Sequence, residues 1–262
     1  MVSKTCKELA MNQQEQLHHY TLRLGDTPLI LAQRLCEWCG HAPELEIDLA
    51  LSNIGLDLLG QARNFLNYAA QLKGTECDED TLAFLRDERE FSNLLLVEQP
   101  NNGFDDTLVR QFFMDAYHVP LYEALIHSCD EQLSAIAEKS LKEAVYHLRF
   151  SRGWMIRLGD GSEESHQRIQ RSVNELWRFT GELFHADDVE IALSELDIAV
   201  DPRSLQAAWL NTINETFTEA TLTVPEKKAY RLGGKQGSHT EHLGLLLTQL
   251  QFVQRAYPNC QW

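Results

Sequence analysis

Apolar residues in this sequence recur every three or four positions over long stretches, which is the spacing of one face of an α-helix. The clearest run places its members on one stripe of a helix from residue 44 to about 72: Ile47, Leu51, Ile54, Leu58, Ala62 and Phe65. No stretch alternates apolar and polar residues for long enough to suggest a strand. Helices of this kind bury their apolar faces by packing on one another, so the sequence predicts an all-α fold.

Glycine, proline and polar clusters divide the chain into expected helices and loops. The first helix is expected over residues 17–40, interrupted or kinked by the Gly-Asp-Thr-Pro sequence at 25–28. Further helices and short elements are expected at 44–72, 80–97 with a break near 90–93, 104–128, 130–158, 162–185, 187–193, 202–218 and 240–256. Residues 226–237 are expected to form a flexible loop. We expect residues 1–16 to be a flexible N-terminal extension and residues 17–262 to form a single helical domain.

The charge of the chain excludes one class of partner. The 262 residues carry a net charge of −16 without a basic cluster, whereas nucleic-acid phosphates need a footprint of lysines and arginines. No apolar run reaches the roughly 18 residues of a spanning helix and no signal-peptide pattern opens the chain, so we expect a cytoplasmic protein without membrane contact. Cys36 and Cys39 form a CxxC without a second pair, which favours buried thiols over a zinc or redox site.

The stretch from Ser140 to Trp154 carries the first candidate site. On a helix, Glu143, Tyr146 and His147 share a stripe that we expect to face the bundle interior. Helical bundles that hold two irons use a Glu-x-x-His on each of two helices and a lone Glu from each of the other two. Here Tyr146 occupies the third position after Glu143, and His147 comes one residue late. The stretch therefore resembles a di-iron helix in a register that no longer fits.

The other long helices offer an equally incomplete set of ligands. Glu37 is the candidate on the first helix, and Asp57 on the second is followed three residues later by Gly60. Asp115 and His118 keep the i, i+3 spacing, which is weak evidence because such pairs also arise by chance. The sequence predicts a vestigial metal site without metal at these positions: Glu37, Asp57, Gly60, Asp115, His118, Glu143, Tyr146 and His147. We expect a buried polar network there, closed by Gln61, His118, Tyr146, His147 or Lys142, because unpaired buried carboxylates are costly.

Four long strings of residues, together with two shorter ones, resemble a known family. The long strings are CGHAPELEIDLAL (39–51), NIGLDLLGQAR (53–63), RDEREFSNLLLVEQP (86–100) and KEAVYHLRFSR (142–152). With 233–235 and 239–242, they are similar to the C subunits of bacterial phenylacetyl-CoA epoxidases, also called ring-1,2-epoxidases, which are multicomponent monooxygenases. The resemblance covers residues 17–262 and leaves out the first sixteen.

The resemblance implies a fold and a set of partners. The fold would be a ferritin-like four-helix bundle with additional C-terminal helices. The chain would pair with a homologous catalytic A subunit, whose di-iron centre activates O2 and epoxidises the ring of phenylacetyl-CoA. A small B subunit would join A and C, and a reductase would supply electrons from NADPH. The C subunit would support the A subunit's structure in aerobic phenylacetate degradation and hold no cofactor of its own. The CoA tail of the substrate would touch two segments of the chain: Glu90, Phe91, Ser92 and Asn93, and Ile191, Ala192 and Leu193.

Three functional hypotheses remain open at this point. The first is the non-catalytic partner subunit, with Phe112, Phe113, Tyr117 and Trp177 as candidates for an apolar pairing face. The second is a di-iron oxygenase or ferroxidase with an atypical site built from Glu37, Asp57, Asp115, His118, Glu143 and His147. The third is a module that binds CoA esters alone. Gly233–Gly237 lacks the spacing of a phosphate loop, and the His239/His242 pair indicates a helix start rather than a metal site.

Overall fold

The computed structural model describes residues 2–74, 77–226, 229–258 and 260, with the side chains of the first helix described from Gln13 onward. Within these residues all regular structure is helical, as α-helices and short 3-10 helices (η). None of the described helices combines the length and the apolar character that crossing a membrane requires.

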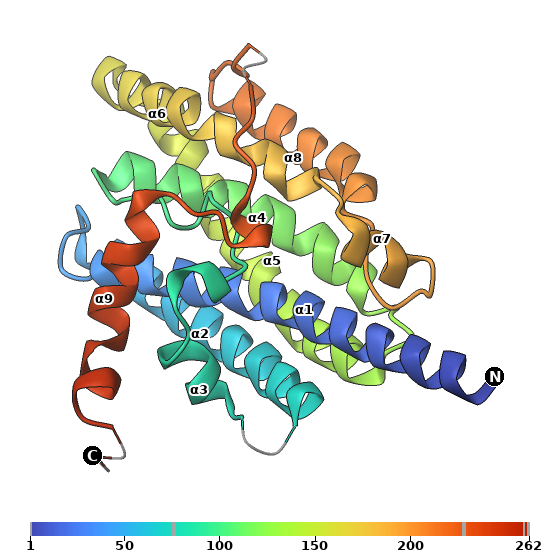
Figure 1. The fold of residues 1–262 in the computed structure, drawn as a ribbon. Helices are drawn as coiled ribbons and strands as arrows, with labels where there is room; N and C mark the ends of the chain where they lie inside the picture. Colours follow the sequence, from blue (N-terminus) through green and yellow to red (C-terminus); the bar gives the residue numbers. More distant parts are fainter. Residues whose placement is uncertain (1, 75–76, 227–228, 259, 261–262) are drawn as a thin grey trace.

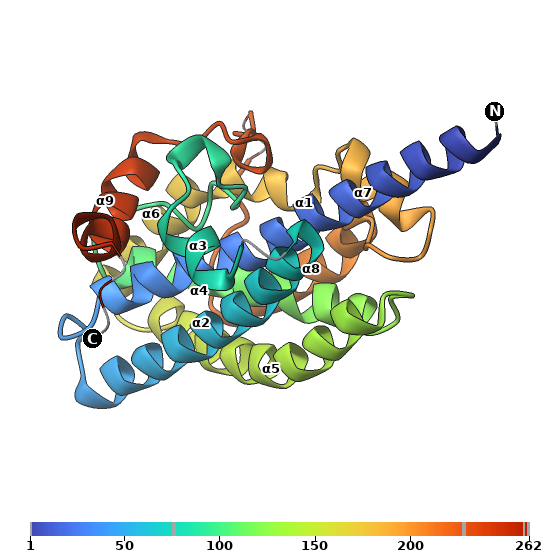
Figure 2. The same cartoon turned by 60° about the horizontal axis from the view of Figure 1, so that its bottom comes forward.

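Four long helices form the body of the molecule. They are α1 (Val2–Glu37), α2 (Leu45–Lys73), α4 (Phe104–Leu125) and α5 (Glu131–Gly159). Figures 1 and 2 show α1 lying along α2 and α4 lying along α5, and α2 also packs on α5. All six members of the apolar stripe on α2, from Ile47 to Phe65, are buried. The ferritin-like four-helix bundle implied by the resemblance is confirmed.

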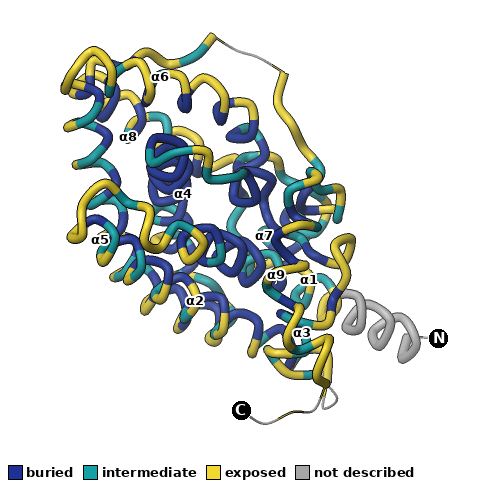
Figure 3. Tube along the Cα trace, turned by 90° about the vertical axis from the view of Figure 1, so that its left-hand side faces the viewer, coloured by how far each residue is buried: buried dark blue, intermediate teal, exposed yellow. Residues whose placement is uncertain are grey.

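The helix α4 occupies the centre of the molecule. Every residue from Asp105 to His118 is buried, because α6 and α8 cover the sides of α4 that the bundle leaves open. In Figure 3 this helix is dark blue over most of its length and is surrounded by other helices. Several of these buried residues are polar and are paired within the protein, as Arg110 is with Gln99 O and Gln111 with Asp115.

The additional C-terminal helices follow the bundle. They are α6 (Glu163–Leu176), η2 (Trp177–Phe184), α7 (Asp188–Ser194), η3 (Pro202–Leu205), α8 (Gln206–Glu219), η4 (Gly234–Gln236) and α9 (Glu241–Ala256). Capping side chains start several of them: Ser162 accepts a hydrogen bond from the backbone N–H of Ser165, and Asp187 forms a capping box with Glu190. Helix α7 packs on α1, and α9 packs on α3 (Glu79–Phe84) and η1 (Glu88–Glu90).

The sequence predicts that residues 25–28 interrupt or kink the first helix; an interruption is wrong, because α1 runs through all four residues, and a kink stays a prediction. Gly25 lies where α2 approaches most closely: a Cβ there would come within 2.8 Å of Leu66 Cδ2. Asp26 is fully buried and accepts hydrogen bonds from the Arg86 guanidinium and the Ser92 N–H. The residues that resemble a helix break therefore serve contacts between segments. That residues 1–16 form a flexible extension stays a prediction, although the backbone of α1 is helical from Val2.

Two further predictions about loops are corrected by the structure. Residues 94–97, expected to be helical, are not: Leu94 is irregular and residues 95–98 form turns. The stretch from Gly233 to Gly237, expected to be flexible, is held from within the protein by the buried Glu182. The carboxylate of Glu182 accepts hydrogen bonds from the N–H groups of Gly233 (2.9 Å), Gly234 (2.7 Å) and Leu95 (2.7 Å). Successive backbone N–H groups, such as those of Gly233 and Gly234, can bind an anion. Here they bind the Glu182 carboxylate of the same chain. Residues 227–228 of the predicted loop lie outside the described residues.

Candidate functional site

Polar side chains gather between α2, α4 and α5, where a metal-binding bundle would hold its ions. We call this set the interior polar network; its members are Asp57, Gln61, Gln111, Asp115, Tyr122, Glu143, His147 and Ser151. Asp57 lies at the solvent edge of the network, with a side chain that is 40% exposed, and belongs to it through its contact with the buried His147. The long helices position these side chains because their apolar neighbours on the same helices pack into the core.

Two contacts join α2 to α5 across the network. His147 Nε2 lies 3.0 Å from Asp57 Oδ2, and Gln61 Nε2 donates to Glu143 Oε2 at 2.9 Å. From α4, the hydroxyl of Tyr122 donates to Gln61 Oε1 at 3.0 Å. The carboxylates of Asp57 and Glu143 are therefore both engaged by side chains of the same protein.

Asp115 is the most deeply placed acid of the network. It is fully buried, and it accepts hydrogen bonds from Ser151 Oγ and Gln111 Nε2, each at 2.7 Å. Burial raises the pKa of Asp115 to about 6, against the lowering effects of the His147 charge and of the two hydrogen bonds. A carboxyl group in this setting holds its proton more readily than an ordinary aspartate.

His118 is a buried neutral imidazole one turn after Asp115 on α4. Burial, with a smaller effect of the His147 charge, lowers the pKa of His118 to about 3. Its ring stacks on that of Tyr122, with 5.5 Å between ring centroids. Asp115 and His118, which keep the expected i, i+3 spacing, contact different neighbours: Asp115 bonds to Ser151 of α5, and His118 lines a cavity beside α1.

The register of the inward residues differs from the prediction. Asp57 of α2 meets His147 of α5, and Gln61 of α2 meets Glu143 of α5. The residues that make these contacts are therefore four positions apart on each helix. Tyr146, which we expected to face the interior, is 45% exposed. Gly60 has no atom within 4 Å of the position that a Cβ would take, so it also lies away from the network. Gly60 and Tyr146, which stand where a di-iron motif would have histidine, therefore do not belong to the interior polar network.

Two more predicted residues lie outside the network. Glu37 is at the end of α1, where it pairs with Arg34 at 2.7 Å and accepts a hydrogen bond from Asn101; its side chain is 39% exposed. Lys142 is exposed and pairs with Glu138 on the same helix at 3.7 Å. Gln61 and His147 close the network as expected, whereas Tyr146 and Lys142 do not.

The donor set does not fit a pair of iron ions. A di-iron bundle needs four carboxylates and two imidazoles that converge. Here His147 is engaged by Asp57, Glu143 by Gln61, and Asp115 by Ser151 and Gln111. In the part of the chain that the structure describes, no group of three or more His, Cys, Asp or Glu side chains is arranged to hold a metal ion. That the chain binds no metal stays a prediction.

The first segment expected to touch CoA is partly buried in the isolated chain. Phe91 and Asn93 are fully buried, with the Arg86 guanidinium 4.2 Å from the centroid of the Phe91 ring. Asn93 Nδ2 donates to Leu94 O at 3.2 Å, while Glu90 is exposed and caps η1 through its carboxylate. Ser92 is half-buried and lines the cavity next to His118.

The second segment lies on α7. Leu193 is fully buried, and Ile191 and Ala192 are half-buried. Their neighbour Glu190 lines the same cavity as Ser92, so the two segments approach each other there. Contact of either segment with CoA stays a prediction.

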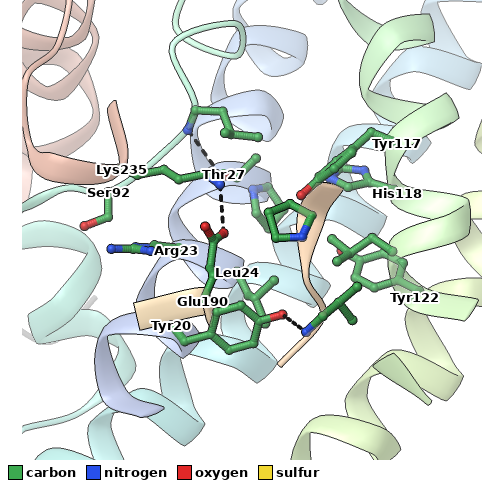
Figure 4. A pocket seen from close by; sticks show the side chains of 15 residues that line it. Tyr20, Arg23, Leu24, Thr27, Ser92, Tyr117, His118, Tyr122, Glu190 and Lys235 are labelled. Carbon is green, nitrogen blue, oxygen red and sulfur yellow. Dashed lines mark hydrogen bonds and ion pairs between the residues drawn. The ribbon is translucent and has the colours of Figure 1, made fainter. Parts of the chain in front are cut away.

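This cavity, hereafter the α1–α4 cavity, has a volume of about 40 Å³ and lies between α1, α4, α7 and η4. Figure 4 shows Tyr117, His118 and Tyr122 along α4 on one side, with Arg23, Glu190 and Lys235 opposite. Lys235 Nζ pairs with Glu190 Oε1 at 2.7 Å, and Arg23 pairs with Asp187 at 2.6 Å. The charges at this wall are therefore balanced.

Sequence reasoning missed several residues of the site. Ser151 lies four residues after His147 on the same face, so helical spacing could have found it. Lys235, Glu190 and Glu182 come from segments far apart in sequence, and no local signal joins them. The CxxC residues Cys36 and Cys39 are exposed, so the prediction that they are buried is wrong; Cys36 lies near the end of α1, where its Sγ approaches Gly55 of α2.

Comparisons with known proteins agree with this architecture. A family model described as phenylacetic acid catabolic protein matches residues 3–262. The C subunit of the 1,2-phenylacetyl-CoA epoxidase of Escherichia coli (strain K12) is 65% identical over 247 residues, which make up 94% of this chain and 99% of that protein.

Proposed function

Because the chain belongs to the family of phenylacetic acid catabolic proteins, we propose that it is the C subunit of a phenylacetyl-CoA epoxidase and acts there as a non-catalytic structural partner. The di-iron centre, in this proposal, belongs to the catalytic A subunit. A small B subunit and a reductase complete the complex, and this chain holds no cofactor.

The observation that carries the proposal is the closure of the interior polar network. Side chains of the types that ligate iron in related bundles bond to each other instead, as Asp57 does with His147 and Glu143 with Gln61. A carboxylate already paired with a cation or an amide is a poor ligand until that contact is broken. The closed network therefore favours a structural role for the bundle over the activation of O2.

The α1–α4 cavity is too small for the aromatic ring of the substrate. An engineered protein cavity of about 150 Å³ is large enough to bind benzene. The α1–α4 cavity has a volume of only about 40 Å³, so an aromatic ring does not fit beside His118 without rearrangement. A larger hollow of about 680 Å³ lies elsewhere on the chain, lined by residues that include Trp38, Phe104 and Trp154, so the proposal rests on the polar network and not on cavity size.

The outer face of α2 is a candidate pairing surface. We define it by four exposed leucines: Leu45 (69%), Leu49 (55%), Leu56 (62%) and Leu59 (46%). Val145 and Tyr146 on the neighbouring helix α5 are also exposed. Exposed apolar residues gathered on one side of a protein commonly mark an interface. The pairing face predicted from Phe112, Phe113, Tyr117 and Trp177 is wrong, because all four are buried in the core.

We propose the catalytic A subunit as the occupant of the outer face of α2. Co-expression of the chain with a tagged A subunit tests this. The double variant Leu49→Asp, Leu56→Asp should fold normally, because both side chains are exposed, and should lose co-purification by at least about tenfold, since two charges are desolvated at the contact. Leu245→Asp on α9 is the matched control, because Leu245 is 69% exposed and lies on another face.

Metal analysis of the same preparations separates a partner role from a catalytic one. The isolated chain, incubated with Fe(II), should contain iron well below one ion per chain, while its complex with the A subunit should contain iron. Two irons per isolated chain would establish the oxygenase or ferroxidase alternative. Equal loss of pairing in the Leu245→Asp control would show that the outer face of α2 is not the contact.

A further inference from the structure

Two polar side chains of α4 are buried against the α1–α4 cavity without a hydrogen-bond partner. His118 is 2% exposed and Tyr117 is 6% exposed. Among the described residues their contacts are with rings: Tyr122 for His118 and Phe184 for Tyr117. Both side chains line the cavity, and Figure 4 shows them on the same wall. Buried polar groups in native proteins are nearly always satisfied, by protein or by ordered water.

Other groups around the cavity also keep unused hydrogen-bonding capacity. Lys235 Nζ has three protons and donates to His185 O at 2.9 Å and to Glu190 Oε1 at 2.7 Å, which leaves one proton. The hydroxyl of Tyr20 accepts a hydrogen bond from Val200 N at 3.3 Å and keeps its own proton. The cavity is therefore lined by donors and acceptors on both of its sides.

The volume and charge of the cavity decide which ligand fits. A buried water needs roughly 10–15 Å³ of accessible volume and two to four polar partners, so about 40 Å³ has room for about three waters. The cations at the wall are paired, Lys235 with Glu190 and Arg23 with Asp187. The His118 ring is neutral because burial lowers its pKa to about 3. Nothing in this lining favours an ion over a small neutral molecule.

We propose that the α1–α4 cavity is an internal hydration site, in which water molecules bridge His118 and Tyr117 of α4 to the polar groups of α1, α7 and η4. The bound waters would connect the side chains of α1 and α4 that line the cavity. This inference concerns the interior of the chain and holds whether or not the chain pairs with an A subunit.

Crystals of the full chain, measured at high resolution with and without xenon pressure, test the proposal. The wild-type chain should show ordered waters within hydrogen-bond distance of the His118 ring and the Tyr117 hydroxyl, and no xenon. Xenon enters dry apolar cavities, so xenon in the wild-type cavity, or featureless density there, would overturn the proposal.

Two variants distinguish a hydrated cavity from an empty one. Tyr117→Phe removes only a hydroxyl and should lose the water bonded to it. His118→Leu should lose the waters on the ring nitrogens and admit xenon, because the leucine offers no polar atom. His41→Leu, at an exposed histidine, is the control and should leave the cavity waters unchanged. Unchanged waters in both cavity variants would contradict the proposal, and the conservative Tyr117→Phe change keeps the test valid if His118→Leu does not fold.

Discussion

Asp115 and His239 are buried titratable residues that make the stability of this chain depend on pH in distinct ranges. For Asp115, burial lifts the pKa to about 6, so the folded state binds a proton more tightly than the unfolded state does. The stability contributed by this proton is complete below the ordinary pKa of 3.8 and is lost as the pH rises through about 6.

The variant Asp115→Asn isolates this contribution. Between pH 4 and pH 7 the free energy of unfolding of the wild-type chain should fall relative to that of the variant, by up to about 3 kcal/mol for a pKa change of about two units. Urea denaturation of both proteins at several pH values measures the difference. A difference that is independent of pH would mean that folding does not shift the pKa of Asp115.

His239 is held by two oxygen atoms. Its Nδ1 lies 3.1 Å from Glu98 Oε2 and its Nε2 lies 2.9 Å from Phe91 O, and the His239 and Glu98 side chains are fully buried. Only the protonated imidazolium can donate to both. Burial lowers the pKa of His239, but the bonds to Glu98 and Phe91 O and the charges of Glu98 and Glu88 outweigh it, so the pKa is raised.

The variant His239→Gln tests this arrangement. Because the pKa of His239 is raised in the folded state, its contribution is complete below 6.5 and is lost as the pH rises through the folded-state value. The wild-type chain should therefore be more stable than the variant at pH 6 by about 1–3 kcal/mol, and this advantage should shrink above neutral pH. Thermal unfolding from pH 6 to pH 9 measures it; a constant advantage would show that folding does not shift the pKa of His239, and an advantage that grows with pH would show that the folded ring stays neutral.

Residue spacing alone identifies much of the network but not its pairing. Glu143 and His147 are recognisable in the sequence as inward residues of α5, and Asp57 as their counterpart on α2. The expected Glu-x-x-His register points instead to Gly60 and Tyr146, which face outward, because the helices meet through i, i+4 pairs. The rotation of one helix against another depends on packing across the core, which a single sequence does not display.

At the scale of single helices, Gly25 and Gly60 offer opposite cases. Both lie inside long helices, but a Cβ at Gly25 would meet Leu66 at 2.8 Å, while a Cβ at Gly60 would have no atom within 4 Å. Gly25→Ala should destabilise the chain by about 1–3 kcal/mol through overpacking. Gly60→Ala should stabilise it by about 0.5–1 kcal/mol through helix propensity. Thermal unfolding of the two variants compares them, and equal effects would contradict the close approach of α1 and α2.

The same comparison explains why one helix boundary is mispredicted. Periodic apolar stripes predict the extents of α2, α4 and α5 to within a few residues, because such long amphipathic patterns have few alternatives. A glycine that admits a neighbouring helix and a glycine that ends a helix look identical in a sequence. The Gly-Asp-Thr-Pro stretch in α1 belongs to the first kind, which only the position of Leu66 and Arg86 reveals.

At the scale of the whole molecule, long-range ion pairs join the C-terminal segments to the bundle and to one another. Arg23 of α1 pairs with Asp187 beside α7, and Lys235 of η4 pairs with Glu190 of α7. The predicted all-α class follows from helical periodicity, and the family from long strings of residues. The way in which the last hundred residues wrap the bundle was not predictable, because it depends on such pairs between distant segments.

The enclosure of α4 has a consequence for the order in which this protein can mature on the ribosome. Phe112 and Phe113 are shielded by Trp177, Trp209 and Phe217, which emerge long after the four bundle helices have been synthesised. A nascent chain that ends before α8 exposes those aromatic rings to solvent and to other chains. Premature termination in the last third of the message should therefore yield aggregation-prone fragments that chaperones and proteases must clear.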